Sequence, residues 1–233
     1  MIAQTESPAD RRILALFALS QVLLFLIPVI VLGRAIGWPA SLRLPAPEAL
    51  PLVARNLGAI QLGYWGYLLT AVAMLPLSLA LRRFVLARGE SGLSVDSMAA
   101  FGVAAAVLKT LGIVRWLVAM PGLALLHAGS SDPIVRTAAE VSYAALNGYA
   151  GAVGELLGVQ LFSGLWLLLL GVGLARVGFR LNGVAAGAIG VGFILTALRS
   201  AFPALEMLGS IMPVLAMLWF LTFAGTVVRA RQS

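Results

Sequence analysis

The chain has 233 residues, of which 61% are hydrophobic and 11% charged, and its mean hydropathy is +1.01. This composition excludes an ordinary soluble domain, and the sequence lacks the alternating segments of an outer-membrane barrel. We therefore expect an all-α integral membrane protein in a lipid bilayer. The net charge of +7 would suggest nucleic acid in a soluble protein, but most arginines stand at the ends of apolar runs, so no nucleic-acid partner is expected.

Several kinds of chemistry are also excluded by residue usage. The chain has no cysteine and one histidine, His127, so disulfides, thiolate metal sites and a bis-histidine haem within one chain are ruled out. It has no Walker A loop, no H-E-x-x-H motif and no clustered carboxylates. We expect no metal and no cofactor, and an enzyme is less expected than a protein without catalytic activity.

Six segments are long enough to span about 30 Å of hydrocarbon at about 1.5 Å per residue. They cover residues 13–32, 59–81, 98–120, 154–175, 183–202 and 208–228. The prediction is therefore a single transmembrane domain over residues 1–233, a bundle of six helices with both termini on the same side. The first apolar run lacks a cleavage-like end and is followed by five more, which favours an uncleaved helix over a signal peptide.

The arginines are distributed unevenly between the two sides of these six spans. One side carries Arg11, Arg12, Arg82, Arg83, Arg88, Arg176, Arg180, Arg229 and Arg231, and the other carries Arg34, Arg43, Arg55 and Arg136. By the positive-inside rule both termini are cytoplasmic. Fifteen arginines against one lysine, with abundant alanine, glycine and leucine, indicate a GC-rich bacterial genome and hence a bacterial inner membrane.

Two long connections are expected outside. The first, between Gly33 and Gly58, contains four prolines and the segment LPLVARNL, which predicts an ordered, interfacial amphipathic helix. The second contains SSDPIVRTAAE, with Asp132 as N-cap, Pro133 at the first helical position and an Arg136–Glu140 pair at i,i+4. A helix is therefore expected to begin at Pro133.

That helix, continued to Arg176, would be about 66 Å long, so we expect it to bend. The glycine-rich stretch 147–154 is the expected place. Glycines also recur in GVAAGAIGVG (183–192), which predicts close packing of the fifth span against its neighbours. A packing role is favoured there over a ligand role.

The only lysine, Lys109, lies inside the third apolar run, six residues before Arg115. A cation in lipid costs about 2.5 to 3.5 kcal/mol on insertion scales unless the protein offsets it. Counted from Ser97, Lys109 lies roughly 18 Å deep, near the midplane, and Arg115 roughly 27 Å deep. Lys109 therefore indicates a buried polar site.

Other polar residues reach similar depths on other spans: Tyr64, Glu155, Gln160 and Arg199. If their faces converge, they form a polar funnel that opens outward, with Lys109 at its floor. Alternatives remain open for each. The arginines can snorkel to headgroups, Tyr64 can belong to an aromatic belt, and an Arg115–Glu155 pair can be purely structural.

Three functions follow from this arrangement. The leading hypothesis is binding or passage of a small polar or anionic molecule, with Lys109, Arg115 and Arg199 as cationic anchors. The alternative is a structural or sensory membrane subunit whose charges hold helices together or meet a homo-oligomeric or other membrane partner. An intramembrane enzyme acting on a lipid is the third.

The stretch from Ala59 to Ala201 resembles an uncharacterised bacterial family of multi-pass membrane proteins, domain-of-unknown-function family 4386. The likeness lies in a second span that ends LSLALRR, a third span that carries Lys109 and Arg115, and the segment LGVQLFSGLWLLLLGVGLARVG before a glycine-rich fifth span. The resemblance implies a six-helix fold of unknown activity and transfers no catalytic residue.

Overall fold

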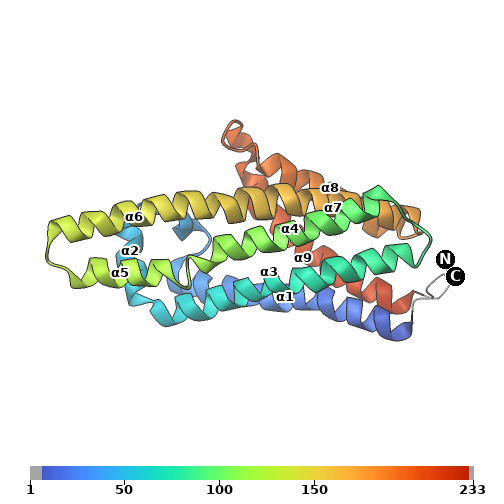
Figure 1. The fold of residues 1–233 in the computed structure, drawn as a ribbon, viewed down its shortest axis with the longest axis horizontal. Coiled ribbons are helices and arrows are strands. Elements are labelled where there is room, and N and C mark those ends of the chain that lie inside the picture. Colours follow the sequence, from blue (N-terminus) through green and yellow to red (C-terminus); the bar gives the residue numbers. More distant parts are fainter. Residues whose placement is uncertain (1–6, 231–233) are drawn as a thin grey trace. The chain divides into compact units, whose positions relative to one another are not determined.

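The computed structural model describes residues 7–230, and these residues form helices and no strands (Figure 1). The elements are α1 (Pro8–Ile36), η1 (Ala40–Arg43), α2 (Ala46–Arg55), α3 (Leu57–Leu86), α4 (Leu93–Val114), α5 (Ala119–Gly129), α6 (Pro133–Ala152), the π-helix η2 (Val153–Phe162), α7 (Ser163–Arg176), α8 (Arg180–Thr196), η3 (Pro203–Leu205) and α9 (Glu206–Arg229). The predicted all-α class is confirmed. Arg231 lies outside the described residues.

Five helical runs are long and apolar enough to cross a membrane. They are Pro8–Ile36, Leu57–Leu86, Leu93–Gly129, Pro133–Arg176 and Pro203–Arg229. Large apolar side chains stand exposed along them, such as Leu16 at 64%, Leu111 at 53% and Leu218 at 53%, as expected of surfaces that contact lipid. This pattern is that of a multi-pass membrane protein. The sixth helix, α8, has 17 residues, short of the usual 20 or so, and the count of six spans stays a prediction.

The chain divides into two compact units. Unit 1 comprises the described residues up to Val22, then Ala71–Val107, and all from Leu156 onward. Unit 2 comprises Leu23–Thr70 and Leu108–Glu155. Helices α1, α3 and α4 each contribute one part to each unit.

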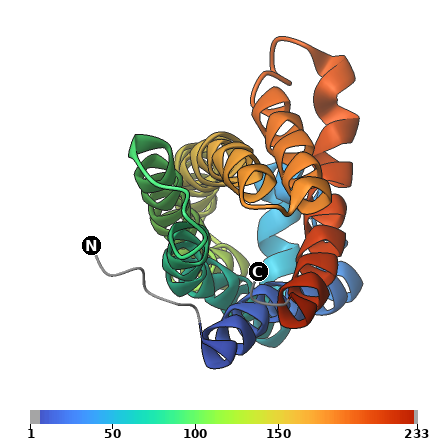
Figure 2. The same ribbon diagram turned by 90° about the vertical axis from the view of Figure 1, so that its right-hand side faces the viewer.

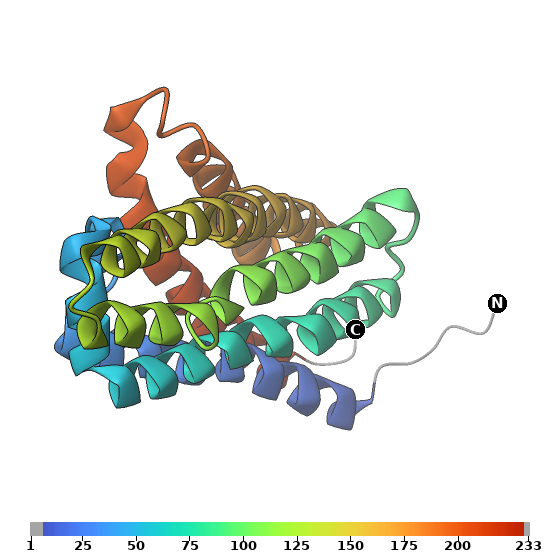
Figure 3. The ribbon, with the colours of Figure 1, turned by 60° about the vertical axis from the view of Figure 1, so that its left-hand side comes forward.

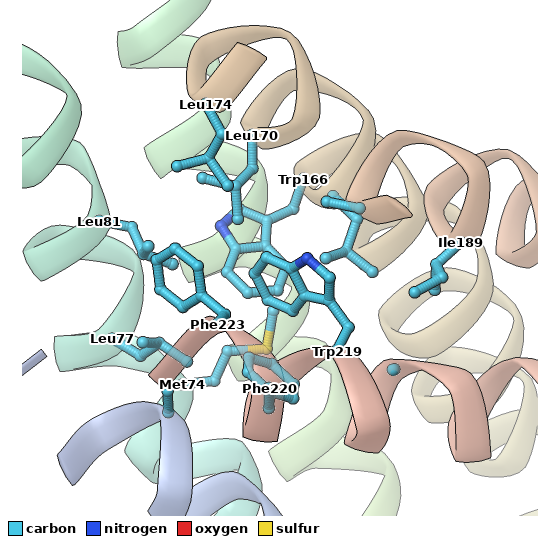
Figure 4. Close-up of a cluster of buried hydrophobic side chains, with 14 of the residues drawn as sticks. Met74, Leu77, Leu81, Trp166, Leu170, Leu174, Ile189, Trp219, Phe220 and Phe223 are labelled. Atoms are coloured by element: carbon cyan, nitrogen blue, oxygen red, sulfur yellow. The ribbon is translucent and has the colours of Figure 1, made fainter. Parts of the chain in front are cut away.

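Unit 1 is built around a cluster of buried apolar side chains (Figure 4). Trp219 stacks on Phe223 with ring centroids 4.9 Å apart, and Trp166 is 2% exposed beside them. The Trp219 indole donates to the backbone oxygen of Asn182, so the one polar atom of this ring is paired. Such packing matters in lipid, where helix association depends on close contact and interhelical hydrogen bonds.

Glycines bring α7 and α8 into backbone contact within unit 1 (Figure 2). A Cβ added at Gly171 would lie 2.5 Å from the backbone oxygen of Gly183, and one added at Gly190 would lie 2.6 Å from that of Gly164. Because residue numbers rise on α8 as they fall on α7, the two helices are antiparallel. The predicted close packing of the glycine-rich helix is confirmed.

Helices α2, α5 and α6 pack together in unit 2 (Figure 3). The predicted ordered segment after Gly33 is α2, whose buried residues follow helical spacing: Ala46, Ala49, Leu50 and Val53. Its location outside the membrane stays a prediction. The predicted start of α6 is confirmed, since the Asp132 carboxylate accepts from the backbone N–H of Ile134 at 2.8 Å and Pro133 occupies the first helical position.

Glu140 of α6 is paired across the α5–α6 hairpin. Its Oε1 lies 2.8 Å from Nε2 of His127, whose side chain is 3% exposed. The sequence suggested Arg136 as the partner of Glu140, one turn away on the same helix. The observed contact instead joins two helices, which makes it a tertiary rather than a local interaction.

The bend expected in the long fourth run stays a prediction, and what the structure shows there is a change of helix type at Val153. There the α-helical hydrogen bonding gives way to a π-helix that continues to Phe162. At the end of the π-helix the Ser163 hydroxyl donates to the Gly158 oxygen at 2.8 Å. The glycine-rich stretch thus changes the helix type without ending the helix.

We expect Gly190→Ala to destabilise the protein by about 1 to 3 kcal/mol, because the new methyl group meets the α7 backbone. Gly187→Ala is the matched control on the same helix, since a Cβ there meets nothing within 4 Å. The control should be neutral or slightly stabilising, as alanine favours helix by about 1 kcal/mol over glycine. Denaturant unfolding in detergent micelles measures both, and equal stabilities for the two variants would contradict the backbone contact.

Candidate functional site

The candidate site begins where α4 breaks at residues 115–118. The backbone there makes tighter i to i+3 hydrogen bonds, from Trp116 N to Ile113 O at 2.9 Å and from Leu117 N to Val114 O at 3.0 Å. The Leu117 carbonyl accepts from the Gln61 side chain of α3 at 3.1 Å. Such a break is tolerated in a membrane segment when side chains satisfy the freed backbone groups. The predicted span 98–120 therefore contains a break.

Arg115 is held by backbone and side-chain oxygens in unit 2. Its Nη1 donates to the Gly112 oxygen, and its Nη2 donates to Oδ1 of Asn147 at 3.3 Å. Asn147 in turn donates through Nδ2 to the Leu42 oxygen at 3.0 Å. Gly151 makes room, since a Cβ there would lie 3.2 Å from Nη2 of Arg115. The guanidinium is thus fixed in orientation by its own helical run and by α6, which is in turn bonded to the Leu42 carbonyl.

Aromatic side chains from three elements surround this guanidinium. Trp116 stacks on Tyr64 of α3 with ring centroids 4.8 Å apart and planes at 4°, and it meets Tyr143 of α6 edge-on at 6.3 Å. The Arg115 Cζ lies 5.7 Å from the centroid of Trp116. We name Tyr64, Arg115, Trp116 and Tyr143 the aromatic–arginine cluster.

Four polar atoms of this cluster are buried and have no hydrogen-bond partner among residues 7–230. They are the Tyr64 hydroxyl, the Arg115 Nε, the Trp116 Nε1 and the Tyr143 hydroxyl. Tyr64, Trp116 and Tyr143 are only 1%, 2% and 1% exposed. Buried polar groups are almost always paired, so four unpaired atoms on adjoining residues call for an explanation.

The charge of Arg115 acts on its surroundings. The guanidinium interacts electrostatically with the hydroxyls of Tyr64, Tyr143 and Tyr67 and with the Glu155 carboxylate. Glu155 is exposed, in contrast to the aromatic residues. No group of three histidine, aspartate or glutamate side chains in the described part of the chain could hold a metal ion. The arrangement is therefore suited to electrostatic and hydrogen-bond recognition.

The six residues predicted for the site fall into both units. Tyr64 and Arg115 are members of the cluster, and Lys109 and Glu155 belong to the same unit. Lys109 is half-buried on α4, six residues before Arg115 in the sequence. The other two, Gln160 and Arg199, belong to unit 1 and are not part of the cluster.

In unit 1, Gln160 is 3% exposed within the π-helix. Arg199 is half-buried in the turn before η3, with its Nη1 beside Gly209 of α9. Depth along separate spans places Arg199 level with Arg115 and Gln160 near the depth of Lys109, which is why the sequence groups them. That grouping stays a prediction.

Three residues of the site were not predicted from the sequence: Trp116, Tyr143 and Asn147. Helical spacing carries a signal for two of them, because Ala139, Tyr143 and Asn147 follow one another at intervals of four and so share a face of α6. Ala139 and Tyr143 are both 1% exposed, which confirms that this face is buried. Trp116 offered no such signal, since tryptophan near a membrane interface is ordinary.

Comparison with known proteins adds a family assignment. A family model described as "Domain of unknown function (DUF4386)" matches residues 16–228. The chain belongs to the DUF4386 family. The DUF4386 match extends beyond the stretch 59–201 that carries the sequence resemblance, and it includes every residue of the aromatic–arginine cluster. No curated protein and no solved structure matches the chain.

We expect Asn147→Ala to lower the free energy of unfolding by about 2 kcal/mol, because it removes a hydrogen bond to a charged group and one to a backbone carbonyl. Asn182→Ala is the matched control, since the contact made there uses the backbone oxygen rather than the side chain. Denaturant titration followed by tryptophan fluorescence compares them. A loss of stability as large in the control would show that Asn147 does not link its neighbours.

Proposed function

We propose that this chain is a bacterial inner-membrane protein that binds or passes a small polar or anionic molecule at the aromatic–arginine cluster. The observation that carries the proposal is the set of four buried polar atoms without a partner among the described residues. Leaving a buried donor or acceptor unsatisfied costs about 1 to 3 kcal/mol. A bound molecule that offers oxygen acceptors removes this penalty.

Two flanking charges support the proposal. Lys109 lies on α4, six residues before Arg115 in the sequence, and adds a second cation to unit 2. Glu155 interacts electrostatically with Arg115 and can orient a polar ligand. A cation inside an apolar span is uncommon without a functional or structural reason, and unit 2 has two on one helical run.

Two observations in unit 1 support six crossings with both termini in the cytoplasm. Helix α8 runs antiparallel to α7 along its glycines and is hydrogen-bonded to α9 at Asn182, so it fits a sixth, short span. Arg11 at the start of α1 donates to the oxygen of Ala230, just beyond α9, which puts the two ends of the described chain side by side. An even number of crossings is the simplest account of that contact, and the arginine bias then favours the cytoplasmic side.

The lengths of two helical runs support a location of α2, α5 and α6 outside the membrane. The run Leu93–Gly129 has 37 residues and Pro133–Arg176 has 44, which correspond to about 55 and 66 Å of helix. The hydrocarbon layer is about 30 Å thick, so a substantial part of both runs lies outside it unless they tilt strongly. The hairpin between them is held by the His127–Glu140 contact.

A structural role for Arg115 is the second candidate function. Two of its three nitrogens already bond, one to the Gly112 oxygen of its own helical run and one to Asn147 of α6. In that case the protein is a structural or sensory subunit, and the guanidinium serves to hold helices together.

The two candidates are separated by Arg115→Met and Lys109→Met. We expect the wild-type protein in detergent to gain thermal stability from at least one solute in a panel of amino acids, sugars, organic acids and inorganic ions. Arg115→Met should stay folded by circular dichroism and lose that gain, Lys109→Met should weaken it several-fold, and Arg199→Met in unit 1 should keep it. Unfolding of Arg115→Met together with no stabilising solute for the wild type would favour the structural role.

A further inference from the structure

We infer that the aromatic–arginine cluster takes a monoanionic oxyanion, either a carboxylate or a phosphate diester. This inference rests on the proposed function and names the ligand class for the same site. It follows from which hydrogen-bonding groups are left over, from the charge around them and from their rigidity.

The unpaired groups favour an acceptor-rich ligand. An indole N–H and a guanidinium N–H can only donate, and the two tyrosine hydroxyls donate most strongly to a charged oxygen. A carboxylate or phosphate diester presents several lone pairs and no donor. A cation is disfavoured by the adjoining guanidinium. A neutral sugar or amide brings N–H or O–H donors of its own, and the indole N–H and the guanidinium N–H cannot accept a hydrogen bond from them.

The charge of the site favours a ligand with a single negative charge. Arg115 is the one formally charged member of the cluster, and it contributes a single positive charge. The Glu155 carboxylate that interacts with it is exposed, so it is not a buried counter-ion. One negative charge on the ligand balances the guanidinium. A dianion such as sulfate leaves an excess negative charge in a region of low dielectric, which is strongly unfavourable.

The cluster is rigid before any ligand binds. Both Nη atoms of Arg115 are engaged by Gly112 and Asn147, so Nε is the nitrogen left for a ligand. The parallel stack of Trp116 on Tyr64 fixes both rings, and Tyr143 meets the indole edge-on. Groups that are already oriented lose little entropy on binding, which favours affinity for a small ion.

The test uses full-length protein in maltoside detergent, which contains no phosphate, and measures the thermal unfolding midpoint at constant ionic strength. The probes are sodium acetate, dimethyl phosphate, dihexanoyl phosphatidylglycerol, sodium sulfate and the neutral ester methyl acetate. We expect the monoanions to raise the midpoint with an apparent affinity at least tenfold higher than that of sulfate, and methyl acetate to have no effect. Stabilisation by acetate and dimethyl phosphate identifies a free anion, whereas stabilisation by the phosphatidylglycerol alone identifies a lipid headgroup.

Tyr64→Phe and Tyr143→Phe assign the effect to the cluster, with Tyr149→Phe as the control, an exposed tyrosine on the same helix as Tyr143. Each cluster variant removes an unpaired hydroxyl, so the ligand-free midpoint should stay or rise, while the affinity for the monoanion should fall about tenfold. Phe variants that lower the ligand-free midpoint and bind the monoanion like the wild type would overturn the assignment, since the hydroxyls would then be paired with water.

The remaining outcomes separate the two proposals. If sulfate or methyl acetate raised the unfolding midpoint more than the monoanions do, and the Tyr variants abolished that rise, the ligand class would be overturned and the binding site would stay in place. The same conclusion would follow if none of these probes stabilised the protein but a neutral solute of the wider panel did. That gain in thermal stability would have to be abolished by Arg115→Met. No stabilisation by any solute would overturn both proposals.

Discussion

The structure depends on one constraint: inside a lipid bilayer each backbone and side-chain polar group needs a partner within the protein. At two places where the described helices depart from regular α-geometry, a side chain bonds a backbone carbonyl. Gln61 bonds the Leu117 carbonyl at the break after α4, and Ser163 bonds the Gly158 carbonyl at the end of the π-helix. The irregular segments are therefore specific features of the fold, each with its own donor.

The aromatic–arginine cluster gathers four of the eight buried side-chain nitrogen and oxygen atoms that have no partner among the described residues. The same helices that pair isolated carbonyls leave two hydroxyls, an indole N–H and a guanidinium N–H unpaired on adjoining residues. The residues are not loosely held, because Trp116 stacks on Tyr64 and Asn147 fixes Arg115. Rigid, buried and unsatisfied donors destabilise a fold, and proteins keep such groups chiefly where function requires them.

Much of the fold could be predicted because its signals are local. The cap at Asp132 and Pro133 follows from two adjacent residues, and the packing of α8 follows from glycine spacing. The break at residues 115–118 has a local signal in Pro121, which lacks an N–H and so leaves the Leu117 carbonyl four residues earlier without its helical donor. The donor that replaces it could not be predicted, since Gln61 lies on a different helix. The sequence also does not reveal that α8 is short. Its apolar residues continue past Thr196, but the helix ends there.

The candidate site shows where counting along the sequence reaches its limit. Rise per residue gives the depth of a side chain in a span, but it leaves open its direction around the helix axis. Depth alone therefore grouped Arg199 with Arg115, although the two belong to different units. Charge made Arg115 conspicuous in an apolar run, whereas Tyr143 looks ordinary until Trp116 and Tyr64 are seen around it. What distinguishes Tyr143 is an unpaired hydroxyl, which is a property of its surroundings in three dimensions and has no counterpart in the sequence of α6.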